Sequence, residues 1–212
     1  MGRVMRQVLI GCVMGIVVFP PIIAAQEGPT AQVKSTVDRV LDILKDPALK
    51  GPAKATERRR VLREAIDPRF DFAEMAKRSL GPHWREQTPQ EREEFERLFA
   101  DLLEQSYYQK LDAYADQDVL YTNEELEGQS AVVRTKIVSK KERLDIPIDY
   151  KLARANGQWR VYDVTIEGVS LVSNYRTQFN RIIQTSSYAE LVKRMRAKQI
   201  GEGTTPAPRR HR

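Results

Sequence analysis

Hydrophobic residues recur along the chain at two spacings, and the change from one spacing to the other divides the chain into three parts. In the first and last parts apolar residues recur every three or four positions, which is typical of amphipathic helices. In the middle part they alternate with polar residues, which is typical of strands that bury one face. Helices are predicted for residues 32–45, 55–66, 72–80, 88–114, 172–183 and 188–195, and strands for residues 119–122, 131–139, 143–153 and 158–167.

The longest predicted helix has a clear start. Thr88 is a good N-cap, Pro89 follows at the first helical position, and Glu91 stands three residues after the cap. This arrangement is a capping box. The helix that follows carries a nearly unbroken apolar stripe on one face: Phe95, Leu98, Phe99, Leu102, Leu103, Tyr107, Leu111 and Tyr114.

The third predicted strand shows the strictest alternation. Its apolar positions are Leu144, Ile146, Ile148, Tyr150 and Leu152, and each is followed or preceded by a polar residue or proline. Alternation of this kind gives the strand one dry and one water-facing side. Pro147 has no N–H to donate, which predicts that this strand lies at a sheet edge or is bulged there.

The order of helices, then strands, then helices is typical of an α+β fold. We expect a curved antiparallel sheet of about four strands, packed against N-terminal and C-terminal helices around an apolar cavity. The same Val and Ile pattern fits a solid core equally well, so the sequence pattern alone leaves both interpretations open.

Residues 1–25 differ in composition from the rest of the chain. Arg3 and Arg6 precede an uncharged apolar run that ends in small residues, the order found in cleaved secretory signals. A retained membrane anchor is the competing interpretation, but Pro20 and Pro21 leave the run short of the roughly 20 apolar residues of a span. The expected organisation is a leader over residues 1–25, one folded domain over residues 26–200 and a disordered basic tail over residues 201–212.

Charge and cysteine content limit the function classes. The formal charge of +6 falls to +4 once the two leader arginines are removed, and this mild excess is typical of a solvated helix face and a frayed tail. We therefore expect no nucleic-acid partner. Cys12 lies in the leader and is the only cysteine, so the mature chain has no disulfide and no thiolate metal ligand. Export without disulfides favours a bacterial periplasmic domain.

The sequence contains few candidate catalytic residues. His83 is the only histidine of the expected folded domain, so the chain lacks a histidine metal cluster and a second imidazole for acid–base work. Asp145 and Asp149 fall on the water-facing side of the third strand. Asp163 shares a face with Val161 under strict alternation, and a buried carboxylate there more often anchors a loop or a helix N-terminus than performs catalysis. We predict no enzyme activity, no metal and no cofactor.

Several motifs together resemble the MlaC or toluene-tolerance family, the periplasmic phospholipid-binding proteins of the Mla lipid-asymmetry pathway. The resemblance runs from "FDFAEMAKRSLGPHWREQTPQEREEFERLFADLLEQSYYQKL" to "WRVYDVTIEGVSLVSNYRTQFNRII". Its most specific parts are Phe70-Asp71-Phe72, Gly81 with Trp84, Thr88-Pro89 before Phe95 and Phe99, Tyr162-Asp163, and Glu167-Gly168-Val169-Ser170.

The resemblance implies a soluble carrier that shuttles phospholipid between an outer-membrane lipoprotein complex and an inner-membrane ABC transporter with an MCE-domain subunit. The carrier would hold the acyl chains between a curved sheet and helices, and we expect it to be a monomer. The resemblance assigns to the lipid-binding wall Phe99, Val161, Val164, Ile166, Val169, Leu171 and Tyr175. Alternation adds Ile146, Ile148 and Tyr150, and the apolar stripe of the long helix adds Leu103. The cavity is expected at or above the upper end of roughly 300–1,000 Å³.

Other hypotheses remain at the level of sequence. An enzyme on a related cone-shaped fold would need titratable groups that point into the cavity. An interaction module would use the helix face of Tyr107, Tyr108 and Tyr114 to receive a partner peptide, and would have a filled core and an exposed groove. Within the carrier class, a hopanoid or another lipid could replace phospholipid.

Overall fold

The computed structural model describes residues 27–139 and 144–201. The leader expected over residues 1–25 and, apart from Gly201, the tail expected over residues 201–212 lie outside the described residues.

The chain folds in the predicted order of helices, strands and helices. Short 3₁₀ turns join the first four helices, which are α1 (Pro29–Lys45), α2 (Ala55–Ile66), α3 (Phe72–Leu80) and α4 (Pro89–Leu111). The strands are β1 (Asp118–Glu127), β2 (Ser130–Ser139), β3 (Leu144–Ala155), β4 (Gln158–Ile166) and β5 (Val169–Ser170). The last helices are α5 (Leu171–Thr185) and α6 (Tyr188–Arg196).

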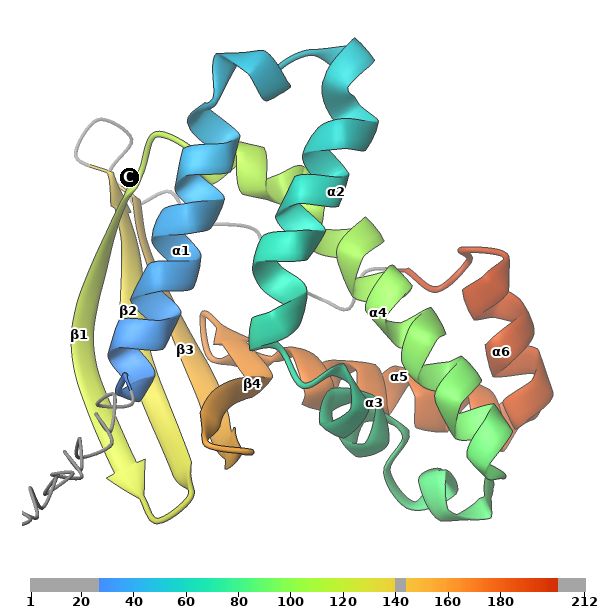
Figure 1. Ribbon diagram of the computed structural model, residues 1–212. Coiled ribbons are helices and arrows are strands. Elements are labelled where there is room, and N and C mark those ends of the chain that lie inside the picture. The colour runs from blue at the N-terminus through green and yellow to red at the C-terminus, as the bar shows by residue number, and fades with distance from the viewer. Residues whose placement is uncertain (1–26, 140–143, 202–212) are drawn as a thin grey trace, which may run out of the picture.

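The five strands form one antiparallel sheet in chain order, β1-β2-β3-β4-β5. This architecture confirms the predicted α+β class, and the two-residue strand β5 extends the expected four-strand meander. Figure 1 shows α1 lying along one face of the curved sheet with α2 beside it, and α3, α5 and α6 gathered at the other end of the molecule. Helix α4 runs between these two groups, so its side chains can pack both against the sheet and α1 and against α3, α5 and α6.

The start of α4 matches the capping box predicted from the sequence. The Glu91 backbone N–H donates to Thr88 Oγ1 over 3.3 Å, and the Thr88 N–H donates to Glu91 Oε2 over 2.8 Å. Both groups would otherwise lack a partner at the helix end. The cap therefore fixes where the long helix begins.

The prediction that Pro147 places its strand at a sheet edge or in a bulge is wrong. Strand β3 lies between β2 and β4, and Pro147 pairs in register with Lys136 of β2. The β3–β4 ladder, however, begins one residue later, at Ile148 opposite Ile166. The Pro147 carbonyl accepts a 3.0 Å bond from the Glu167 N–H in the turn beyond that ladder. The missing N–H thus faces the end of β4, where no ladder bond is lost.

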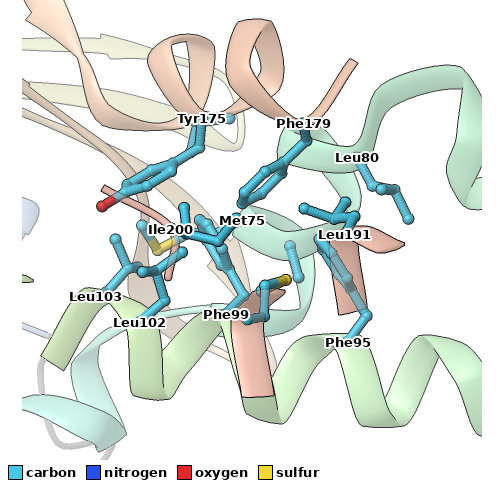
Figure 2. Packing of buried hydrophobic residues seen from close by; sticks show 13 residues of the cluster. Met75, Leu80, Phe95, Phe99, Leu102, Leu103, Tyr175, Phe179, Leu191 and Ile200 are labelled. Atoms are coloured by element: carbon cyan, nitrogen blue, oxygen red, sulfur yellow. The ribbon is translucent and has the colours of Figure 1, made fainter. Parts of the chain in front are cut away.

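The helical end of the molecule has a solid aromatic core. The Phe99 ring meets the Tyr175 and Phe179 rings edge-on, with centroids 5.5 Å and 5.9 Å apart. Figure 2 shows these side chains from α4 and α5 pointing toward each other, with Met75 and Leu191 beside them. Phe99, Tyr175 and Phe179 are completely buried. Such edge-to-face packing adds to the stability gained from burial alone.

Candidate functional site

An apolar cavity of about 270 Å³ lies between the inner face of the sheet and the helices α1 and α4. Its wall is almost entirely hydrocarbon and aromatic. From the helical side the wall includes Val37, Val40, Leu41, Leu44, Leu103, Tyr107, Tyr108 and Leu111, and from the sheet Val119, Ile137, Ile146, Ile148, Tyr150, Val164 and Ile166. Phe70, Phe72, Met75, Tyr114 and Leu171 complete much of the remainder.

Strand register explains why the sheet side of the cavity is apolar. Ile146 lies opposite Ile137 on β2, and Ile148 lies opposite Ile166 on β4. Tyr150 lies opposite Val164. Directly opposed residues share a face of the sheet, so three strands present a continuous apolar stripe to the helices.

A bulge in β4 lets both ends of that strand face inward. Val161 pairs with Leu152 and Asp163 pairs with Lys151, so Tyr162 is the extra residue and the alternation shifts by one. Val161 before the bulge and Val164 after it therefore both belong to the buried inner cluster. The expectation that Asp163 shares a face with Val161 is wrong, because the bulge turns Asp163 to the side of Lys151.

Asp163 is nevertheless buried, because α5 begins over it. Its carboxylate accepts hydrogen bonds from Ser170 Oγ at 2.7 Å and the Val172 N–H at 3.2 Å, and pairs with Lys151 Nζ at 3.2 Å. Its exposed fraction is 5%. The contacts confirm that this carboxylate anchors a helix N-terminus, the structural role predicted for it.

Most of the residues expected to bind lipid meet at the cavity. Leu103, Ile146, Ile148, Tyr150, Val164, Ile166 and Leu171 line it directly. Val161 lies next to it, in a smaller pocket of about 30 Å³ that Tyr150 also lines. Contact of these side chains with lipid stays a prediction.

Three of the expected residues lie elsewhere. Phe99 and Tyr175 belong to the solid aromatic core, where ring-to-ring packing leaves them no free surface. Val169 is half-buried in the short strand β5 and lines neither the main cavity nor the smaller pocket. Their placement differs from expectation because motif matching identifies positions without showing which interior they face.

Sequence reasoning missed the contribution of α1 and of the tyrosines. The stripe of Val37, Val40 and Leu44 was visible at helical spacing, but periodicity shows that a helix has an apolar face and not what that face covers. Tyr107 and Tyr108, which the interaction-module hypothesis assigns to a partner groove, line the cavity instead.

Two tyrosine hydroxyls on the wall, those of Tyr108 and Tyr150, have raised pKa values. Burial raises the pKa of Tyr150 to about 12. Burial also raises the pKa of Tyr108, with a smaller contribution from the Asp67 carboxylate. Neither phenol is therefore poised to act as a base near neutral pH.

Three charged side chains reach the otherwise apolar wall: Glu104, Lys110 and Glu167. Glu104 is buried and forms ion pairs with Arg63 and, at 3.4 Å, with Arg59 on α2. These pairs join α2 to α4 across the edge of the cavity. Lys110 lies over the Tyr107 ring, 5.5 Å from its centroid.

The cavity is smaller than the sequence-based expectation. Its volume of about 270 Å³ lies just below the roughly 300–1,000 Å³ typical of ligand pockets. The expected volume was that of a pocket for a two-chain lipid, whereas in the structure the apolar stripe of α1 packs toward the sheet and fills part of this space. A ligand with two long chains would require the wall elements to move apart.

Among the residues that the structure describes, no helix combines the length and the apolar character needed to cross a membrane.

The fold and the cavity define a class of protein, an α+β domain that encloses an apolar chamber between a curved antiparallel sheet and helices. Comparison with known families assigns the chain within that class: residues 34–197 match the model of the MlaC protein family. The chain therefore belongs to the MlaC family.

Individual relatives agree with this assignment. The chain is 22% identical to the intermembrane phospholipid transport system binding protein MlaC of Haemophilus influenzae, over 81% of this chain and 82% of the relative. It is 23% identical to the toluene tolerance protein ttg2D of Pseudomonas putida, over 82% and 81% of the two chains. A solved structure, the phospholipid-binding protein from Ralstonia solanacearum in complex with a phospholipid, superposes with a TM-score of 0.70 at 28% identity, covering 80% of this chain and 95% of that one.

Proposed function

We propose that this protein is a phospholipid carrier that holds acyl chains in the cavity between the sheet, α1 and α4. The observation that carries the proposal is the apolar wall: the strands β1 to β4 contribute aliphatic and aromatic side chains from one face of the sheet, and α1 and α4 contribute theirs from the opposite side of the cavity. The Ralstonia solanacearum structure in complex with a phospholipid supports it, because that protein shares the fold over nearly its whole length.

The physical chemistry of lipid transfer accounts for such a cavity. Moving an acyl chain from a membrane into water costs about 0.8 kcal/mol per methylene, so a two-chain lipid of some thirty methylenes faces roughly 25 kcal/mol. A carrier removes most of this cost when its interior is nearly as apolar as the bilayer. Binding and release are then close to balanced, and no covalent chemistry is needed.

The proposed route is periplasmic. The carrier would be secreted through a cleaved leader, act as a monomer, and exchange lipid with an outer-membrane lipoprotein complex and an inner-membrane ABC transporter that has an MCE-domain subunit. The name of the Haemophilus influenzae relative, which places it in an intermembrane phospholipid transport system, supports this route.

A vesicle transfer assay tests the carrier activity. Donor vesicles containing a fluorescent phospholipid and acceptor vesicles without it are held on either side of a membrane that passes only protein. Catalytic amounts of the protein should move label to the acceptors, while an equal amount of an unrelated secreted protein should not. Transfer no faster than in buffer would contradict the proposal.

A further inference from the structure

The volume of the cavity limits how much hydrocarbon this conformation of the protein can hold. That volume is about 270 Å³. An apolar protein cavity of about 150 Å³ holds one benzene molecule, which has six carbon atoms, so on the same scale this cavity has room for roughly eleven carbons. A phospholipid with two long chains brings some thirty methylenes. Most of such a lipid therefore enters only if the wall moves apart.

The length of the cavity gives a similar limit. Ile146, Ile148 and Tyr150 line it in a row on β3, and at about 3.3 Å per residue this row spans about 13 Å. Leu103 and Leu111 line it from α4, about 12 Å apart along the helix axis. An extended hydrocarbon chain advances about 1.25 Å per carbon, because its bonds of about 1.5 Å meet at nearly tetrahedral angles. The lined length therefore matches about ten carbons.

Taken together, the volume and the length describe a space for one chain. Ten carbons laid along the cavity nearly fill its volume, which leaves no room for a second chain beside the first. The smaller pocket of about 30 Å³, which shares Val37, Phe70 and Tyr150 with the main cavity, adds room for only about one carbon on the benzene scale.

The wall also shows which part of a lipid would enter. Most of its side chains are aliphatic or aromatic. The buried carboxylate on the wall, that of Glu104, is already paired with Arg59 and Arg63. The cavity therefore favours hydrocarbon, and a polar headgroup is better solvated outside it.

We propose that the cavity in this conformation binds lipids with a single acyl chain, such as lysophospholipids and fatty acids, and that it accepts about ten carbons of the chain. This is a second class of ligand beyond the two-chain phospholipid of the proposed function, and it requires no movement of the wall. The headgroup and the remainder of a longer chain stay outside. Each methylene that enters should strengthen binding about fourfold, the factor that corresponds to burying one methylene, and each later one less than about twofold.

Calorimetric titration with two series of single-chain lipids tests this limit. Lysophosphatidylcholines and fatty acids with even-numbered chains from butanoyl to palmitoyl, each below its micelle concentration, are added to protein stripped of lipid. The logarithm of the dissociation constant should fall in equal steps up to the decanoyl chain and flatten from the dodecanoyl chain onward. The break should come at the same chain length in both series, because the cavity holds the chain and not the headgroup.

The variant Val37→Phe tests whether the chain lies in this cavity. The change adds the bulk of about four carbon atoms to the wall, so the break should move to a chain about four carbons shorter. Val132→Phe is the matched control, since Val132 lines neither the main cavity nor the smaller pocket and lies on the face of β2 opposite to the buried Val133. It should keep the native break. Circular dichroism checks the fold of each variant.

Two results with the native protein would overturn the inference. One is binding that strengthens in equal steps up to the palmitoyl chain, because the whole chain would then enter. The other is uptake of two-chain phospholipid from vesicles without binding of any single-chain lipid, which would leave the carrier proposal standing. Because the native series alone fixes the limit, the test does not depend on the stability of the variants.

The variants and the vesicles separate the remaining cases. A break at the same chain length in native protein and folded Val37→Phe would place the chain elsewhere and overturn the inference. The expected break in a native protein that takes up no two-chain phospholipid would support the inference and overturn the proposed function.

Discussion

Substitution of tryptophan for Ile148 should reduce the amount of bound phospholipid about tenfold or more while leaving the fold intact. Ile148 lies at the centre of the sheet wall, opposite Ile166, and its side chain borders the cavity of about 270 Å³. An indole at this position occupies space that the acyl chains need. Because that space already exists, the overpacking cost should stay below about 1–3 kcal/mol, the usual cost in a filled core.

The control for this experiment is tryptophan on the opposite face of the sheet. Lys136 lies on β2 with 43% of its side chain exposed, so Lys136→Trp adds the same bulk outside the cavity. Bound lipid is measured by extraction and phosphate analysis, and folding by circular dichroism and a urea transition. Equal lipid content in native protein and Ile148→Trp would show that the chains lie elsewhere.

Truncation of Phe99 should have the opposite effects: it should reduce stability and leave lipid binding unchanged. Phe99→Ala should lower the free energy of unfolding by about 3–5 kcal/mol, the cost of deleting a fully buried ring from a packed core. The ring contacts Tyr175 and Phe179 edge-on and does not line the cavity. Molecules that remain folded should therefore bind as much phospholipid as the native protein.

The stability measurement must use lipid-free protein, because a ligand that binds only the folded state raises its apparent stability. Urea transitions of native protein and Phe99→Ala, each refolded after lipid removal, give the difference. Arg97→Ala, on the exposed side of the same helix, should shift the free energy by no more than about 0.5 kcal/mol. If Phe99→Ala bound less lipid but kept the native free energy of unfolding, Phe99 would line the cavity, as the family resemblance implies, and the prediction would be wrong.

Structural features that depend on a single helix or strand were predicted most accurately from the sequence. The alternation of Ile146, Ile148 and Tyr150 predicted the sheet wall correctly, since β2 pairs with β3 over this whole stretch and β4 pairs with it from Ile148 onward. The capping box at Thr88 and Glu91 predicted the start of α4 correctly. A helix cap, like strand alternation, depends on only a few adjacent residues.

Features that depend on several elements at once could not be predicted in this way. The bulge that turns Asp163 away from Val161 is set by the pairing with β3, and local alternation carries no sign of it. The apolar face of α1 was visible, yet nothing in its spacing indicated that Val37 would narrow the cavity. The volume was overestimated for this reason.

Native mass spectrometry of the protein purified from a bacterial periplasm would show directly whether the protein carries a phospholipid. We expect a population whose mass exceeds that of the polypeptide by one phospholipid, and organic extraction should release that lipid for identification. Protein that carries no lipid, and that also fails to take any from vesicles, would contradict the claim that this cavity holds acyl chains.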